Sequence, residues 1–186
     1  LDQIVQRPDM RLGEIDLLPA SAELELLTGT GKMSASCPTT IVSAFGEQVL
    51  RTPGNIALSF GATTLTYREL DKRANQWAHY LRELGVVTGT PVAICLERSA
   101  EMIVCILGIL KAGGVYVPVN PSYPAERVRY MLSDMSASIV ISSQNHKELL
   151  AGEDRLVIYI EEGSRLAEEQ PRHSPRIGPA ATDLAY

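Results

Sequence analysis

The chain has 186 residues, 45% of them hydrophobic and 21% charged, a balance typical of a soluble globular protein with its own core. A formal net charge of -5 and the lack of a basic run exclude nucleic acid as a partner, because phosphate contacts require clustered Lys and Arg. The longest apolar stretch, residues 102–110, is about half of the roughly 20 residues that cross a bilayer, so we expect no membrane partner.

The first 38 residues carry little periodic pattern. Residues 20–27 are a helix candidate, and residues 28–38, rich in Gly, Ser and Thr, are typical of a linker. The sequence has no initiator Met and no signal-peptide pattern, which favours an internal piece of a longer, cytoplasmic protein. Three widely spaced cysteines, Cys37, Cys95 and Cys105, agree with reduced thiols. We expect a domain to begin near Thr39.

The next segment predicts a helix, a hairpin and a second helix. Thr40 can cap a helix over residues 41–51, and strand-like runs follow at 56–60 and 63–66. Thr66 and Glu69 form a capping box, which fixes the start of the second helix. This helix has one apolar stripe, typical of an amphipathic surface helix. The stripe consists of Leu70, Ala74, Trp77, Ala78, Leu81 and Leu84, and Gly85 follows as a left-handed end residue.

From residue 92 onward, strands and helices alternate. The apolar runs predict strands at 92–96, 115–119, 138–142 and 156–160, with helices at 99–112 and from 124 onward. This alternation indicates an α/β fold, a layered parallel sheet with helices on both faces. Residues 161–182, rich in Glu, Arg and Pro, are expected to form an exposed loop, and residues 184–186 to begin another strand.

Two glycine-containing segments are candidates for phosphate or nucleotide sites. Residues 28–34 (TGTGKMS) lack a P-loop's first Gly, have Met33 where Ser or Thr should follow the Lys, and follow no strand. Gly113 and Gly114 end a predicted helix, which is the commoner use of glycine there. Neither segment predicts a cofactor site.

The remaining polar candidates also favour structural roles. Ser142 and Ser143 lack the Gly-x-Ser-x-Gly elbow of a nucleophile. Residues 97–99 (ERS) lie at a strand-to-helix junction, where α/β folds bind ligands, but they fit a salt bridge beside a helix cap equally well.

The three histidines do not predict a metal site. His79 is expected on the solvated face of its helix, and His146 and His173 lie in polar segments without a second ligand at metal spacing. The sequence therefore predicts no catalytic, cofactor-binding or metal residue in this chain.

Several motifs resemble one enzyme family. Residues 65–70 (LTYREL) and 110–120 (LKAGGVYVPVN) resemble the first two core motifs of adenylate-forming enzymes. With residues 121–127 (PSYPAER), their spacing is similar to that of the amino-acid adenylation domains of nonribosomal peptide synthetases. Asn120 stands where many members carry Asp. Residues 7–18 resemble the end of a condensation domain with its linker.

This resemblance implies a domain plan and a chemistry. Residues 1–38 would be a condensation-domain tail and linker, and residues 39–186 the amino-terminal portion of an adenylation domain, truncated before its phosphate loop. Residues 183–186 resemble the stretch immediately before that loop. The intact domain would use ATP and Mg²⁺ to convert an amino acid into aminoacyl-AMP and load it on the phosphopantetheine thiol of a carrier domain.

The implied partners are the rest of the adenylation domain, an upstream condensation domain and a downstream carrier domain. We expect the fragment alone to be inactive. Two alternatives stay open: a non-catalytic scaffold or half of a split enzyme needing a second chain, and a relative of acyl-CoA ligases. Residues 7–18 and 121–127 speak against the last.

Overall fold

The computed structural model describes residues 39–152, 154–175 and 179–186. The chain divides into two compact units, Leu1–Pro38 and Thr39–Tyr186. The helices and strands of the described residues all belong to the second unit. The expectations for residues 1–38, including the segment 28–34 and Cys37, lie outside the described residues.

The first elements form as predicted. Helix α3 (Ile41–Arg51) starts at Thr40, whose hydroxyl accepts the amide of Ser43. Strands β1 (Ile56–Phe60) and β2 (Thr63–Thr66) pair as an antiparallel hairpin. Helix α4 (Tyr67–Glu83) begins with the complete capping box of Thr66 and Glu69, and Gly85 follows with φ 92°. These starts and ends are set by local hydrogen bonds, which is why the sequence could predict them.

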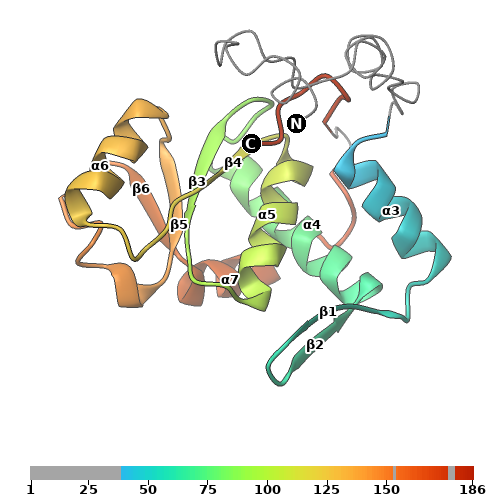
Figure 1. Ribbon diagram of the computed structural model, residues 1–186. Coiled ribbons are helices and arrows are strands. Elements are labelled where there is room, and N and C mark those ends of the chain that lie inside the picture. Colours follow the sequence, from blue (N-terminus) through green and yellow to red (C-terminus); the bar gives the residue numbers. More distant parts are fainter. Residues whose placement is uncertain (1–38, 153, 176–178) are drawn as a thin grey trace, which may run out of the picture. The chain divides into compact units, whose positions relative to one another are not determined.

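The second part is a parallel sheet with helical connections, and the predicted α/β class is confirmed (Figure 1). The sheet has the strand order β4-β3-β5-β6, and every pairing is parallel. Its elements are β3 (Pro91–Cys95), α5 (Ala100–Ala112), β4 (Val115–Pro118), α6 (Ala125–Asp134), β5 (Ile139–Ser142), the short 3-10 helix η2 (Gln144–His146), β6 (Leu156–Tyr159) and α7 (Ile160–Glu168).

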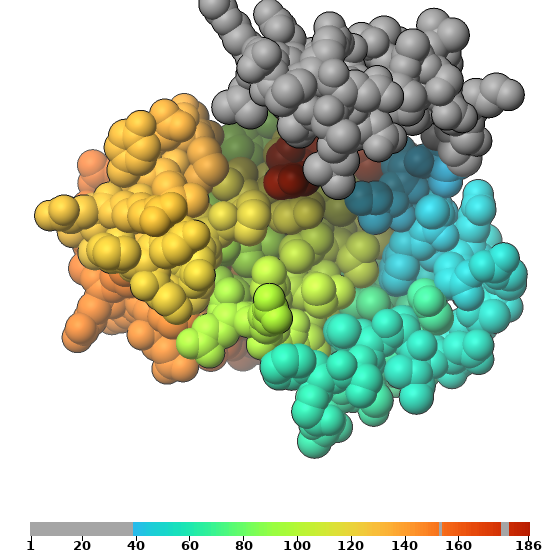
Figure 2. Space-filling model, viewed as in Figure 1, coloured from blue at the N-terminus to red at the C-terminus, as the bar shows by residue number. Residues whose placement is uncertain are grey.

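Helices cover both faces of this sheet. Alternate residues of β3 point to opposite sides, so Val92 and Ile94 join the core under α4, α5 and α7, whereas Ala93 and Cys95 join a second core with Val128 of α6. Figure 1 shows α6 on one side of the sheet and α5 with α4 on the other. In Figure 2, α3 and the hairpin form one side of the visible face and α6 the opposite side.

Helices α4 and α5 approach closely at a glycine. An added Cβ on Gly108 of α5 would lie 2.7 Å from the Cβ of Trp77 and 3.4 Å from the carbonyl oxygen of Ala74. Trp77 is 2% exposed and is the single Trp of the chain. Because Trp77 Cβ is fixed to the α4 backbone, Gly108 sets how closely the two helices pack. In the described part of the chain, no helix combines the length and apolar character that a bilayer span requires.

The prediction of a loop over residues 161–182 was wrong for its first part, which forms α7. The buried residues Gly163 and Ala167 face the core, and an added Cβ on Gly163 would lie 2.8 Å from the Trp77 ring. The helix is thus stabilised by packing on α4, a contact that local composition does not reveal. Residues 169–175, called the strap below, leave α7 and lie against α4.

The segment predicted to begin a strand, residues 184–186, lies against the outer edge of β4. The amides of Val115 and Val119 donate toward β3, so Tyr116 and Pro118 face away from β3. The Tyr116 amide donates to the carbonyl of Ala185 at 3.0 Å, and the rings of Tyr116 and Tyr186 stack with centroids 5.5 Å apart. The contact is a single backbone hydrogen bond without a regular strand.

Candidate functional site

A cleft of about 530 Å³ opens at the carboxyl ends of β3 and β4, the edge where parallel α/β sheets bind ligands. Glu97 and Arg98 contribute to one wall and Asn120 to the other. From the sequence, residues 97–99 fit either a ligand site or a helix cap. The structure gives Ser99 the cap, since its hydroxyl accepts the Met102 amide at 3.1 Å, and leaves Glu97 and Arg98 exposed in the cleft.

The loop after β4 is shaped by its own side chains. The Asn120 carboxamide oxygen accepts the Ser122 amide at 2.9 Å, and the Arg127 guanidinium lies 4.0 Å from the centre of the Tyr123 ring. Asn120 therefore acts as a turn former, a role that an Asp oxygen at this position could also perform.

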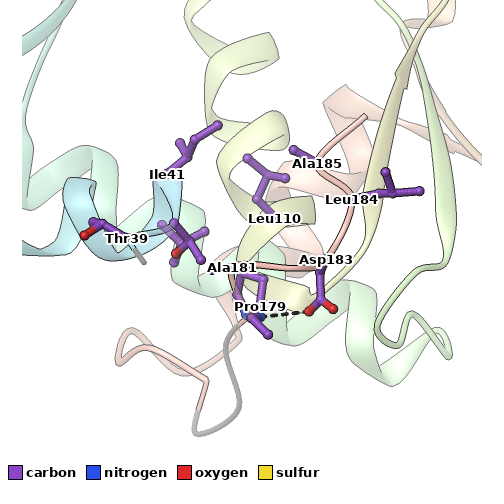
Figure 3. Close-up of a pocket in the computed structure, with 11 residues that line it drawn as sticks. Thr39, Ile41, Leu110, Pro179, Ala181, Asp183, Leu184 and Ala185 are labelled. Carbon is purple, nitrogen blue, oxygen red and sulfur yellow. Dashed lines mark hydrogen bonds between the residues drawn. The ribbon is translucent and has the colours of Figure 1, made fainter. Parts of the chain in front are cut away.

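An apolar hollow of about 220 Å³ lies between α3, α5 and the terminal segment (Figure 3). Ile41 comes from the first turn of α3, Leu110 from α5, and residues 179–185 form the other wall. The Ala180 amide donates to the Asp183 carboxylate at 2.8 Å, which closes a turn. Ile41 and Leu184 are 59% and 73% exposed. Because the Asp183 carboxylate already accepts this hydrogen bond, the hollow is suited to packing rather than to acid-base chemistry.

A buried polar cluster joins α4 and α5. Lys111 is 3% exposed, and its ammonium donates to Asp71 and to the carboxamide oxygen of Asn75, each at 2.7 Å. The Asn75 nitrogen donates to Asp71 and to the carbonyl of Arg172 in the strap, each at 2.9 Å. The Phe45 ring of α3 lies 5.7 Å from the ammonium. The three side chains Asp71, Asn75 and Lys111 are called the Lys111 cluster below.

Sequence reasoning missed this cluster, because Lys and Asn are mostly exposed residues. Each buried polar atom in it has a partner, as burial of a charge requires. The one sequence signal is that Lys111 falls in the second segment that resembles a core motif, residues 110–120.

The strap covers the α4 face that was expected to be solvated. Gln76 donates to the carbonyls of Glu168 and Gln170, and His79 Nε2 lies 3.0 Å from the His173 carbonyl. The prediction of a solvated His79 was thus wrong in part: its ring packs edge-on against His173, with centroids 5.0 Å apart. Among the described residues, no group of three or more His, Cys, Asp or Glu side chains could hold a metal ion.

The glycine and serine candidates occupy structural positions. Gly113 ends α5 with φ 94°, and an added Cβ on Gly114 would lie 3.1 Å from the Thr90 carbonyl oxygen, so backbone already fills the space beside this pair. The Ser142 hydroxyl donates to the Cys95 carbonyl, and the Ser143 hydroxyl donates to Glu161. Neither hydroxyl has a histidine base.

The two described thiols are also unsuited to nucleophilic chemistry. Burial raises the pKa of Cys95 and raises the pKa of Cys105 well above its usual value, because the thiolate cannot be hydrated there. The described residues contain no Ser/Thr/Gly-rich loop that ends in Lys. That this chain holds no catalytic or cofactor-binding residue stays a prediction.

Two known peptide synthetases are similar to this chain in sequence. Tyrocidine synthase 3 of Brevibacillus parabrevis is 47% identical over 150 residues, which cover 80% of this chain and 2% of that protein. Bacitracin synthase 3 of Bacillus licheniformis is 45% identical over 149 residues, again 80% of this chain and 2% of that protein. This chain thus spans about 2% of the length of these two relatives.

A solved structure extends the likeness to the fold. The AMPPNP-bound form of the nonribosomal peptide synthetase FmoA3 has a TM-score of 0.69 and 29% identity, over 78% of this chain and 15% of that chain. The sequence model of the family described as AMP-binding enzyme matches residues 45–186. The chain therefore belongs to the AMP-binding enzymes and is part of an adenylation domain of the nonribosomal peptide synthetase kind.

Proposed function

We propose that the protein containing this chain activates an amino acid with ATP as aminoacyl-AMP and loads it on a carrier-domain thiol. Family membership supports the adenylation step, and the peptide synthetases among the relatives support an amino acid as the substrate. In this proposal residues 39–186 are the scaffold on which the reacting groups are mounted, and the condensation and carrier domains are its partners.

The position of residues 183–186 carries the proposal. These residues resemble the stretch before the phosphate loop, and the Ala185 carbonyl accepts a hydrogen bond from the Tyr116 amide of β4. The second motif-like segment, residues 110–120, contains β4. The segment that resembles the second core motif would thus hold the residues that precede the phosphate loop. The sheet would then help to set where that loop starts.

The chemistry explains why a scaffold alone is insufficient. In the first step a carboxylate oxygen bonds to the α-phosphorus of ATP and the bond to pyrophosphate breaks; in the second the carrier sulfur bonds to the acyl carbon and AMP leaves. Both steps bring anionic groups together, so cations and oriented amides must stabilise the charge that develops. None of residues 1–186 matches a family motif that supplies these groups, so we expect the chain alone to be inactive.

The test is ATP–pyrophosphate exchange over all common amino acids. The 186-residue chain should give no exchange, whereas a polypeptide extended through the phosphate loop and the rest of the domain should exchange with one or a few amino acids. Robust exchange by the 186 residues alone would overturn the scaffold role. An extended polypeptide that folds but exchanges with no amino acid would overturn the proposed activity.

A second possibility is that this chain is one half of a split enzyme. It is favoured by the hollow, whose walls include the exposed side chains of Ile41 and Leu184 and could be covered by another polypeptide. Mixing the chain with a separate carboxy-terminal half should then restore exchange. No restored activity, together with stable folding of the chain alone, would favour a non-catalytic scaffold instead.

A further inference from the structure

The Lys111 cluster connects four segments that are distant in the sequence. Lys111 is on α5, Asp71 and Asn75 are on α4, the Phe45 ring is on α3, and Asn75 also binds the Arg172 carbonyl of the strap. We propose that Asn75 and Lys111 are positioning residues that fix the places of residues 172–175 and 179–186. The catalytic consequence of this inference rests on the proposed function, but its structural content does not.

The cluster has only one way to satisfy its polar groups. Both N–H bonds of the Asn75 carboxamide are used, by Asp71 and the Arg172 carbonyl, and its oxygen accepts from Lys111. Asn75 is 1% exposed and Lys111 3%, so water cannot replace a lost partner without a rearrangement. Turning the Asn75 carboxamide over would leave Lys111 facing N–H groups. The Arg172 carbonyl is therefore held at a defined place on α4.

The strap has little else to hold it. Residues 171–174 are exposed, and Pro175 is its one buried residue. Further hydrogen bonds to α4 join Gln76 to the Gln170 carbonyl at 3.3 Å, the Gln170 carboxamide to the exposed Glu83 carboxylate at 2.8 Å, and His79 to the His173 carbonyl. A segment with so few apolar contacts depends on its hydrogen bonds for its position.

The carboxyl-terminal turn of α5, which carries Lys111, also lies beside the terminal segment of the chain. Leu110, the neighbour of Lys111, lines the hollow whose other wall is residues 179–185. Gly113 and Gly114 then lead directly into β4, where Tyr116 binds the Ala185 carbonyl. A shift of the last turn of α5 would therefore disturb both residues 172–175 and residues 179–186.

Two variants test this in the full 186-residue chain. Asn75→Asp keeps an acceptor for Lys111 but has no N–H for the Arg172 carbonyl, and Lys111→Met keeps the side-chain length but removes the charge. The matched control is Val128→Ala, which removes buried apolar volume from the other core. All three are compared under conditions where circular dichroism shows a folded chain. Asn75→Asp also places a second carboxylate beside Asp71, so either cluster variant that folds decides the matter.

The first readout is trypsin cleavage after Arg172, followed by mass spectrometry. Trypsin must bind the chain around Arg172 in an extended form, which the hydrogen bond from Asn75 to the Arg172 carbonyl hinders. Asn75→Asp removes this donor, and Lys111→Met removes the partner that orients the Asn75 carboxamide, so cleavage should be about tenfold faster in both variants. Val128→Ala should cleave at the wild-type rate. Equal acceleration in the control, or none in Asn75→Asp, would show that the cluster only stabilises the fold.

The second readout is hydrogen exchange of two adjacent amides. The Tyr116 amide is protected by Ala185, whereas the Val115 amide is protected by Thr90. In Lys111→Met the Tyr116 amide should exchange about tenfold faster with Val115 unchanged. Unchanged Tyr116 exchange, or equal acceleration of both amides, would contradict the link to the terminal segment.

The activity readout uses an extended polypeptide that performs ATP–pyrophosphate exchange. Lys111→Met should raise the KM for ATP several-fold, with the KM for the amino acid nearly unchanged, because the phosphate loop would start from a displaced segment. Equal changes in both constants would contradict the catalytic consequence. If the wild-type polypeptide shows no exchange, the proposed function fails, and the cleavage and exchange rates still decide the positioning role.

Discussion

Replacing Gly108 by Ala tests how closely α4 and α5 pack. The new Cβ would lie 2.7 Å from Trp77 Cβ, well inside ordinary contact distance, and neither atom can rotate away because both are attached directly to helix backbone. The helices must separate, and overpacking of this kind costs about 1–3 kcal/mol. Ala gains about 1 kcal/mol over Gly in helix propensity, so we expect a net loss of up to about 2 kcal/mol in the free energy of unfolding.

Gly46 provides the matched control. It lies in the interior of α3, and an added Cβ there would have no neighbour within 4 Å. Gly46→Ala should therefore stabilise the chain by about 0.5–1 kcal/mol through backbone entropy alone. The same chemical change is thus expected to have opposite signs at two helix positions.

The measurement is urea unfolding followed by the fluorescence of Trp77, which reports on the contact itself. With a slope of about 2 kcal/mol per molar urea, Gly108→Ala should lower the midpoint by up to about 1 M. Its native emission should also shift, since the ring must move. A midpoint that rises for Gly108→Ala as it does for Gly46→Ala would refute the argument that Gly108 is required for the close approach.

Three further changes test local features. Thr66→Ala should cost about 1 kcal/mol in thermal or urea unfolding, because it removes the α4 cap. Hydrogen bonds from the Thr66 amide and then its hydroxyl hold the pKa of Glu69 below its usual value, so the stabilisation is present above the unfolded pKa of about 4.3 and is lost as pH falls. Glu69→Gln should accordingly flatten the acid side of the stability curve; an unchanged acid side would contradict this. Burial raises the pKa of both Cys95 and Cys105, so neither should react with a neutral disulfide reagent until the chain unfolds, as peptide mapping of the labelled protein can establish. Asn120→Asp keeps the oxygen that accepts the amide two residues on, and should change the urea midpoint by less than the equivalent of about 0.5 kcal/mol; a larger loss would mean that the amide group of Asn120 is needed.

Local signals account for what the sequence predicted well. The capping box at Thr66, the left-handed Gly85 and the alternation of strands and helices are written within a few residues of the elements they define. Hydrogen bonds between neighbours in the chain set these features, so tertiary structure was not needed to infer them.

Contacts between distant residues account for what the sequence did not reveal. Asn75 meets Arg172, 97 positions away, and Lys111 meets Asn75 across 36. Local composition predicts a loop in place of α7, because the helix depends on the fit of Gly163 on Trp77, and glycine locally disfavours a helix. The candidate site shows the same limit. The alternation of strands and helices indicated which edge of the sheet carries the cleft, whereas a function for that edge could be inferred only from the family resemblance.

Pro118 restricts what the outer edge of β4 can bind. Tyr116 and Pro118 face away from β3, but proline has no N–H, so Tyr116 is the one outward backbone donor of this strand. A chain that paired with β4 two residues out of this alignment would place its carbonyl opposite the Pro118 ring, which has no N–H to donate. The edge is thereby selective for one alignment and a poor template for indiscriminate strand addition, which protects a short parallel sheet from aggregating along that side.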